Sequence, residues 1–360
     1  MEKFRVGVLG GTGMVGQRFI SLLEGHPWYE VTVIAASPRS AGKTYEEAVN
    51  GRWKLDTPMP QRVKSIVVQD VNDVAAVAGE VDFVFSAVDM SKDEIRAIEE
   101  AYAKAETPVV SNNSAHRWTP DVPMMIPELN PEHADVIPYQ RARLGTRSGF
   151  IAVKPNCSIQ SYTPALHALL DYRPQVVVAT TYQAISGAGK TFADWPEMVD
   201  NVIPYIGGEE EKSEQEPLRI WGHLENGVIV KAQKPLITTQ CIRVPVTNGH
   251  MAAVFVSFEK KPEREEILRR WAEFKGLPQE WELPSAPRQF IRYMEEDNRP
   301  QTALDRDYER GMGVCLGRLR EDTVYDYKFV GLSHNTVRGA AGGAILCAEL
   351  LTRQGYIVKK

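Results

Sequence analysis

The chain has 360 residues, enough for two compact domains at roughly 150 residues each. Hydrophobic residues make up 43% and charged residues 25%, a balance that excludes an intrinsically disordered chain. The formal net charge of -5 offers no positive field to a polyanion, so nucleic-acid binding is not expected as the main function. No apolar stretch reaches the roughly 18 to 20 residues of a membrane span, and the first residues hold no apolar signal core. We therefore expect no membrane partner and a cytoplasmic location.

The four cysteines, Cys157, Cys241, Cys315 and Cys347, are too few and too scattered for a disulfide scaffold. The sequence contains neither a Cys-x-x-Cys pair nor a His-Glu-x-x-His stretch, so no metal is expected. A single cysteine can still act as a nucleophile.

The first residues alternate between strand and helix, as in a nucleotide-binding domain. A buried strand is predicted over 4–9, a glycine-rich stretch over 10–16, a helix over 17–23 and a second strand over 31–36. This is the context of the Gly-x-Gly-x-x-Gly fingerprint, in which the backbone approaches a pyrophosphate at a helix N-terminus. A plain glycine turn is the alternative. We expect a dinucleotide to contact Gly11, Thr12, Gly13, Met14 and Val15.

The end of the second predicted strand bears on which dinucleotide binds. NAD-preferring domains usually place an acid there for the ribose 2′-hydroxyl. Here the residues are Ser37, Pro38, Arg39 and Ser40, and two hydroxyl groups with a guanidinium can hydrogen-bond a 2′-phosphate instead. We therefore expect NADP, held by Ser37, Arg39 and Ser40. An ordinary exposed arginine is the alternative.

The alternation continues to about residue 155 and then changes. The earlier part holds predicted strands at 81–88, 108–111 and 151–154 and a helix at 92–105. The later part holds a β-branched run at 176–182 and two segments with antiparallel character at 241–246 and 251–258. The predicted fold class is α/β: a Rossmann-type nucleotide-binding domain, then an α+β domain with a mixed or antiparallel sheet.

Cys157 follows the strand predicted at 151–154 and precedes an expected helix at 159–170, which Pro164 interrupts. A cysteine at a helix N-terminus gains thiolate character, and the free N–H groups there can hold an oxyanion. The alternative is a small buried hydrophobic residue, and position alone does not decide between the two.

A nucleophilic cysteine usually needs a base, and His250 is the candidate because of its surroundings. Asn248-Gly249 is a strong two-residue hairpin signal between two predicted strands. In such a hairpin Arg243, Thr247 and His250 share one face, with the arginine and histidine roughly 13 Å apart at the backbone. A structural histidine is the alternative.

Two further segments can bind anions. The stretch 111–117, which ends in Arg117, follows a strand of the nucleotide domain, where sites tend to form. Lys212 is a lone cation in the acidic run 209–216, which by spacing alone is interpreted as a solvated helix face.

Six motifs in order resemble a known family. They are Gly-Gly-Thr-Gly-Met-Val-Gly at 10–16, Ser-Asn-Asn-Ser-Ala-His-Arg at 111–117, Pro-Asn-Cys-Ser at 155–158, Gln-Ala-Ile-Ser-Gly-Ala-Gly at 183–189, Arg-Val-Pro-Val-x-x-Gly-His at 243–250 and His-Asn-Thr-Val-Arg-Gly-Ala-Ala-Gly-Gly at 334–343. From the first strand to the last helix, the sequence resembles the aspartate-semialdehyde dehydrogenases of the archaeal and fungal-like branch.

The resemblance implies an NADPH-dependent reductive dephosphorylation of L-4-aspartyl phosphate, a step toward lysine, methionine and threonine. Cys157 would attack the acyl phosphate and form a thioester, which is then reduced. His250 would be the acid/base partner, and Gln183 would orient the acyl intermediate.

The resemblance also implies the substrate contacts. Arg243 would hold the α-carboxylate, with Glu209 near the amino group and Asn156 also at the substrate. Arg117 and Lys212 would hold the phosphate, which replaces the solvated-face interpretation of Lys212.

The remaining implications concern the cofactor and the assembly. Further cofactor contacts would come from Ser86, Ser186, Gly187, Asn335 and Thr336. The NADP-binding domain would comprise 1–155 and 335–360, and the catalytic and dimerisation domain 156–334, in a homodimer or homotetramer.

Related acyl-reducing enzymes are the nearest alternatives. Malonyl-CoA reductase shares the last motif, but Lys212 supplies a phosphate cation that a thioester substrate does not need. N-acetyl-glutamyl-phosphate reductase is less similar in its motifs. A non-catalytic NADP-sensing regulator should have lost Cys157 or His250, and both are present.

Overall fold

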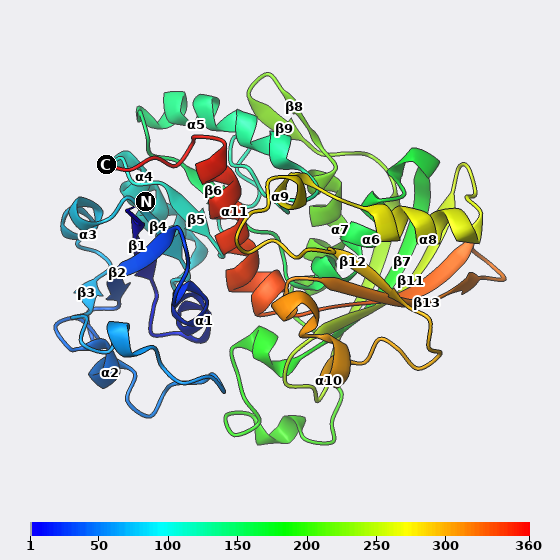
Figure 1. The fold of residues 1–360 in the computed structure, drawn as a ribbon, viewed down its shortest axis with the longest axis horizontal. Helices are drawn as coiled ribbons and strands as arrows, with labels where there is room; N and C mark the ends of the chain where they lie inside the picture. The colour runs from blue at the N-terminus through cyan, green and yellow to red at the C-terminus, as the bar shows by residue number, and fades with distance from the viewer. Residues whose placement is uncertain (1) are drawn as a thin grey trace.

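Two six-stranded sheets form the framework of the protein, which a computed structural model describes over residues 2–360 (Figure 1). In the first sheet the strand order is β3-β2-β1-β4-β5-β6 and all neighbours are parallel. Its strands are β1 (Phe4–Leu9), β2 (Tyr29–Ala36), β3 (Gln69–Asp70), β4 (Phe83–Ser86), β5 (Val109–Ser111) and β6 (Ile151–Val153). This is the order of the Rossmann fold, which confirms the predicted fold class for this half.

Helices accompany this parallel sheet. They are α1 (Met14–Leu23), α2 (Tyr45–Ala48), α3 (Val74–Glu80), α4 (Lys92–Lys104), α5 (Ile137–Leu144) and the C-terminal α11 (Gly342–Arg353). Ile345 and Leu350 of α11 belong to one buried cluster with Val8 of β1 and Phe85 of β4. The end of the chain, red in Figure 1, therefore packs with its beginning. We retain the division into 1–155 with 335–360 and 156–334 as a proposal.

The second sheet is mixed, with the order β10-β7-β11-β14-β13-β12. Its strands are β7 (Pro174–Gln183), β10 (Leu236–Arg243), β11 (His250–Phe258), β12 (Ile291–Met294), β13 (Val314–Glu321) and β14 (Tyr327–Ser333). The other elements of this half are the hairpin of β8 (His223–Glu225) and β9 (Val228–Val230) and the helices α6 (Thr163–His167), α7 (Glu209–Ile220), α8 (Arg264–Glu273), α9 (Leu277–Glu280) and α10 (Thr302–Asp305). Along β11 every second residue is buried, so one face of the strand packs inward.

The predicted hairpin between residues 241 and 258 is wrong. Both strands exist, but β7 lies between them: β10 pairs with β7 in parallel and β11 pairs with β7 in antiparallel orientation. The Asn248-Gly249 turn signal reports a local bend and carries no information on which strands pair, because a third strand from elsewhere in the chain can insert between them.

The interruption predicted near Pro164 is confirmed, but no part of 159–170 forms a long α-helix. The segment forms a 3₁₀ turn at Ser158–Ser161, the short α6, and a second 3₁₀ turn at Leu170–Tyr172. Pro164 lies in the first turn of α6, where its missing N–H costs nothing, but a helix running through from residue 159 would need that N–H to bond the carbonyl oxygen of Gln160. The helix is therefore broken into pieces.

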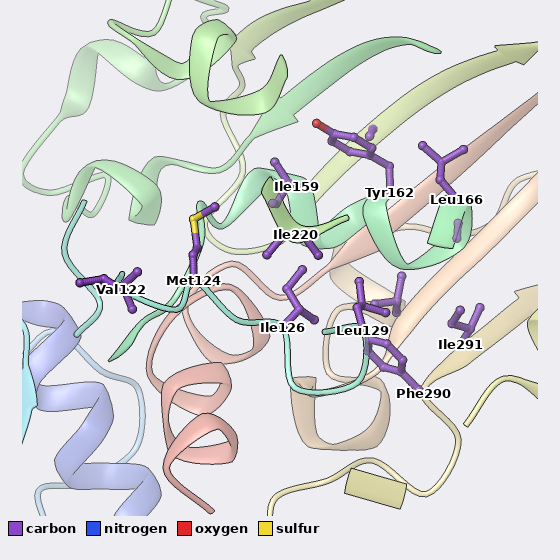
Figure 2. Packing of buried hydrophobic residues seen from close by; sticks show 14 of the residues in the cluster. Val122, Met124, Ile126, Leu129, Ile159, Tyr162, Leu166, Ile220, Phe290 and Ile291 are labelled. Atoms are coloured by element: carbon purple, nitrogen blue, oxygen red, sulfur yellow. The ribbon is translucent and has the colours of Figure 1, made fainter. Parts of the chain in front are cut away.

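A buried cluster between the two sheets holds this broken segment in place. Figure 2 shows Ile159, Tyr162 and Leu166, which follow Cys157, beside Ile126 and Leu129 of the loop that links β5 to α5. Tyr162 also donates its hydroxyl to the carbonyl oxygen of Ser213 in α7 at 2.6 Å. The turn that carries Cys157 is thus fixed by apolar contacts on one side and by α7 on the other.

Within residues 2–360 the structure has no helix that is both long and apolar enough to cross a membrane.

Candidate active site

Three polar residues from three neighbouring strands form a row at one edge of the second sheet. Arg243 at the end of β10 pairs with Gln183 at the end of β7. Met251 of β11 pairs with Tyr182 of β7, which sets His250 beside Gln183 on the other side. All three side chains are buried. The sequence predicted that Arg243 and His250 share a face, but the strand between them supplies Gln183 as well.

Gly187, in the 3₁₀ turn after β7, closes over this row. A Cβ at Gly187 would lie 2.9 Å from Nη1 of Arg243 and 3.1 Å from Nε2 of His250. The arginine and the histidine therefore converge on one point, and a larger residue at 187 would displace them. Arg243 also donates from Nη1 to the carbonyl oxygen of Ala184 at 2.7 Å.

The ring of His250 is held as a hydrogen-bond donor. Its Nδ1 accepts from the backbone N–H of Ala184 at 3.0 Å, and its Nε2 has no hydrogen-bond partner among residues 2–360. A neutral ring that accepts at Nδ1 carries its proton on Nε2. Burial, assisted by the charge of Arg243, lowers the pKa of His250 to about 3. The unpaired Nε2–H is thus available to a ligand oxygen.

Cys157 lies between β6 and the first 3₁₀ turn, and its thiol is not a pre-formed thiolate. Burial and the charge of Glu209 raise its pKa to about 11, although the charges of Lys154, Arg117 and Arg243 oppose the rise. The expected activation by a helix N-terminus is wrong because only a four-residue 3₁₀ turn follows. No hydrogen bond joins Cys157 to His250 in the part of the chain that the structure describes.

Glu209 connects Asn156, the residue before Cys157, to Gln183 in the row described above. Its carboxylate accepts from Asn156 Nδ2 at 3.0 and 2.9 Å, from Lys212 Nζ at 2.8 Å and from Gln183 Nε2 at 3.3 Å. Burial alone would raise the pKa of Glu209, but Lys212 and the hydrogen bonds outweigh it and the net shift is downward. The side chain is therefore an anion at neutral pH.

Spacing alone predicted that the acidic run in α7 is a solvated helix face, but the structure shows that part of it is buried. Glu216 is fully buried; it accepts from Arg117 Nη1 at 3.0 Å and from the backbone N–H of Asn156 at 2.5 Å. Sequence analysis missed Glu216. Its signal was its position seven residues after Glu209, which places both carboxylates on the same side of a helix.

Arg117 is fixed from three directions. Besides Glu216, it donates to the carbonyl oxygen of Lys154 at 3.0 Å and to that of Asn112 at 3.4 Å. A guanidinium has five N–H groups, so two remain for a ligand.

Asn335 joins the last motif to the row. It donates to the Ser186 hydroxyl at 2.8 Å and accepts from the N–H of Gly249 at 2.8 Å. Ser186 and Asn335 thus lie next to Gly187 and His250, and Thr336 is the residue after Asn335.

The glycine-rich loop borders a separate cleft of about 490 Å³, a size typical of ligand sites. Among the residues predicted to bind a cofactor, it is lined by Thr12, Gly13, Ser37, Arg39 and Ser40. Lys43 and Arg52 also line it and were missed by sequence analysis, because they come from the irregular segment after β2. Three cations face a single acid, Asp89, so the cleft suits a ligand with phosphate groups.

Eight of the predicted cofactor residues do not line this cleft: Ser186, Gly187, Asn335 and Thr336 beside the second sheet, and also Gly11, Met14, Val15 and Ser86. The hydroxyl of Ser86 is buried and accepts from Asn113 Nδ2 at 3.2 Å. The residues that follow it, Ala87–Met90, line the cleft instead. The carbonyl oxygen of Gly11 is occupied by the hydroxyl of Tyr45 at 2.8 Å. Met14 and Val15 already belong to α1.

Comparison with known proteins places the chain in a family. Family models described as "Semialdehyde dehydrogenase, NAD binding domain" and "Semialdehyde dehydrogenase, dimerisation domain" match residues 5–137 and 166–338. The aspartate-semialdehyde dehydrogenase of Methanothermobacter thermautotrophicus is 46% identical over 96% of this chain and 98% of its own. That of Aspergillus fumigatus is 43% identical over 99% of both chains. This chain belongs to the aspartate-semialdehyde dehydrogenase family.

Membership in this family confirms the resemblance found in the motifs. It identifies the protein as an enzyme and not as a non-catalytic NADP-sensing regulator. A crystal structure described as aspartate semialdehyde dehydrogenase with NADP from Candida albicans has a TM-score of 0.87 and 37% identity, and covers 99% of this chain and 100% of its own. The similar sequences come from archaea and fungi, as the motifs predicted. The match to the dimerisation domain supports a homo-oligomer.

Proposed function

We propose that this member of the aspartate-semialdehyde dehydrogenase family catalyses the reversible, phosphate-dependent reduction of L-4-aspartyl phosphate to L-aspartate 4-semialdehyde through a thioester on Cys157. The observation that carries the proposal is the unpaired, buried Nε2–H of His250 in a row with Gln183 and Arg243, linked through Glu209 to the residue next to Cys157.

The substrate contacts follow from the charges around Cys157. Arg243 would bind the α-carboxylate and Glu209 the ammonium group, since each presents the opposite charge. Arg117 and Lys212 would bind the phosphate. Lys212 uses one of its three N–H groups on Glu209 and Arg117 keeps two N–H groups free, so both retain donors.

The acyl transfer proceeds at Cys157. The sulfur of Cys157 forms a bond to the acyl carbon, the C–O bond to phosphate breaks with the electron pair leaving on the phosphate, and the departing phosphate takes up the thiol proton. NADPH, when bound, supplies the hydride that reduces the acyl carbon. The oxyanion that develops accepts a hydrogen bond from His250 Nε2–H, and its collapse releases the aldehyde and the Cys157 thiolate, which regains its proton from water.

This sequence of steps needs no proton transfer from His250. A neutral imidazole suffices as a donor to the oxyanion, which agrees with a ring whose Nδ1 is already engaged by Ala184. The acid/base role implied by the resemblance is thereby narrowed to that of a hydrogen-bond donor.

We propose NADP as the cofactor, in the cleft lined by Arg39, Lys43 and Arg52. The structural relative from Candida albicans is described with NADP, and the three cations suit a 2′-phosphate and a pyrophosphate. Ser186, Gly187, Asn335 and Thr336 would lie toward the nicotinamide, beside His250. A homodimer or homotetramer is the proposed assembly, and the cytoplasmic location stays a prediction.

The test is reduction of NADP by aspartate semialdehyde, measured with and without inorganic phosphate. We expect a rate that requires phosphate, because release of the acyl group from Cys157 then forms the acyl phosphate. Activity with malonyl-CoA and NADPH but none with aspartate semialdehyde would overturn the substrate assignment and retain the cysteine chemistry. Activity with N-acetyl-glutamate semialdehyde alone would overturn the substrate assignment in favour of that of N-acetyl-glutamyl-phosphate reductase.

A further inference from the structure

Two ion pairs within residues 2–360 join the NADP-binding domain of the proposed division to its catalytic domain, and they differ in exposure. The side chains of Arg117 and Glu216, 3.0 Å apart, are 9% and 1% exposed, so this pair is shut away from water. Those of Lys54 and Asp194 are 30% and 35% exposed, and Lys54 Nζ donates to both carboxylate oxygens of Asp194 at 2.6 and 2.9 Å. The buried pair is a fixed anchor, whereas the half-exposed pair can open into solvent at little cost.

Lys54 moves with the wall of the nucleotide cleft. Its backbone N–H donates to Gln17 Oε1 at 2.8 Å, and Gln17 Nε2 donates to the carbonyl oxygens of Arg52 at 2.8 Å and Thr12 at 3.0 Å. Gln17 is buried, and Thr12 and Arg52 both line the cleft. Because a buried amide keeps its hydrogen-bond partners in place, the backbone at Lys54 is tied to the glycine-rich loop.

Asp194 belongs to the segment that leaves the active-site turn at Gly187. Its carboxylate accepts from the backbone N–H of Thr191 at 3.1 Å and from the Thr191 hydroxyl at 2.8 Å, and its own N–H donates to that hydroxyl at 3.3 Å. These bonds close one turn of the chain and orient the carboxylate. In Figure 1 the blue loop after α2 reaches toward the green loop after β7, and the ion pair joins the two.

The proposed path of the cofactor runs between these two segments. NADP would extend from the cleft at Arg39 to the turn at Ser186 and Gly187. The segment of Lys54 forms one wall of this path, and the segment of Asp194 continues from the turn at its other end. A closed ion pair therefore keeps the two ends of the path at a fixed separation, and a bound cofactor leaves more easily when the pair is open.

We propose that Lys54 and Asp194 are positioning residues that hold the two sides of the cofactor site together and slow the release of NADPH. Neither residue lines the cleft, so each acts through the segment to which it belongs. No covalent bond changes; the ion pair is the interaction that opens and closes. The inference rests on the placement of NADP in the proposed function.

The test is the dissociation rate of NADPH, followed by stopped-flow fluorescence while excess NADP displaces it from the enzyme. The variants are Lys54→Met, Asp194→Asn and the two together, with Lys54→Arg as the variant that keeps the charge. Asparagine retains an acceptor oxygen for Thr191 and loses the charge. Lys64→Met is the matched control, because Lys64 is 29% exposed and pairs with Glu46 at 3.0 Å inside the first half. We expect about threefold faster release from each single neutral variant and the wild-type rate from Lys54→Arg and Lys64→Met.

Asp194→Asn separates the proposal from a simple effect of charge. NADPH is an anion, so removal of a nearby carboxylate by itself would slow its release. Faster release instead requires that the contact between the two segments has been lost. The double variant should release NADPH no faster than either single variant, because both substitutions remove the same interaction.

Release at the wild-type rate from Asp194→Asn, or additive acceleration in the double variant, would overturn the proposal. Thermal unfolding of each variant is the accompanying measurement, since a merely structural pair would lower the midpoint without changing the rate of release. Failure of the proposed function is separate: it would appear as absent turnover of aspartate semialdehyde by the wild type, while the release rates of NADPH still report on the ion pair.

Discussion

The nucleotide cleft and the site around Cys157 hold their polar groups in opposite ways. Ser37, Arg39 and Lys43 are exposed at the cleft, on segments that follow the ends of parallel strands. Gln183, Arg243 and His250 are buried, and each makes hydrogen bonds inside the protein. Exposed cations can move to meet a ligand, whereas buried groups are already oriented before it arrives.

This difference predicts how each region responds to mutation. Substitutions in the cleft should change affinity and cofactor preference, since water can replace the lost contact. Substitutions around Cys157 should change the chemical step or the stability, because a buried partner is left without its hydrogen bond.

The largest effect is expected for Cys157→Ser. The variant should bind NADP but lose at least about 10⁴-fold in kcat, since a hydroxyl has no thiolate character at neutral pH. Phosphate-dependent NADP reduction and a separate NADP-binding titration measure the two properties. Turnover at the wild-type rate would remove Cys157 from the mechanism.

His250→Ala should lower kcat by about 10²- to 10³-fold, the usual cost of removing one donor to a developing oxyanion. In the wild type, the ring should stay neutral through the working range because burial holds the pKa of His250 at about 3. A kcat profile measured from pH 5 to 9 should therefore show no loss of rate from this residue near pH 6.5. A histidine-dependent acid limb at pH 6.5 in the wild type, absent from the variant, would contradict the donor role.

A buried histidine outside the site should make stability depend on pH. His133 accepts from Asn130 Nδ2 at 3.0 Å and faces the carbonyl oxygen of Gly222 at 3.1 Å, and burial lowers its pKa to about 4. Between pH 6.5, the usual pKa of histidine in an unfolded chain, and about pH 4, the pKa of His133 in the folded protein, the unfolded chain binds the proton and the folded chain does not. The unfolding free energy should thus fall as pH falls, by about 2 kcal/mol from this residue between pH 7 and pH 5. Urea unfolding at both pH values should show a smaller drop in His133→Gln.

The smallest effect is expected in the cleft. Arg39→Ala should weaken the preference for NADP over NAD by about tenfold, or about 1.4 kcal/mol, because it removes one charge-assisted contact to the 2′-phosphate. The ratio of kcat/KM for the two cofactors measures it, with Lys43→Met as the neighbouring comparison. An unchanged ratio in Arg39→Ala would place recognition of the 2′-phosphate on Lys43, Arg52 or the two serines.

Much of the first half was predictable from local patterns. The strand predicted at 4–9 coincides with β1, and those at 31–36 and 151–154 lie within two residues of the bounds of β2 and β6. Buried parallel strands are continuous apolar runs, so they can be recognised one at a time. The second half resisted the same reasoning because its pairings join distant segments: a turn signal at residue 248 could not reveal that β7 lies between β10 and β11.

The sequence by itself determined the family, the Rossmann-type order of the first half and the identity of Cys157, His250 and Gln183 as candidates, since each rests on a contiguous motif. Only the tertiary structure decided that Glu216 holds Arg117, that Ala184 makes His250 a donor, and that Lys54 pairs with Asp194. These properties depend on burial and on partners from distant segments, and a pKa or a hydrogen-bond direction follows from what surrounds a group in space.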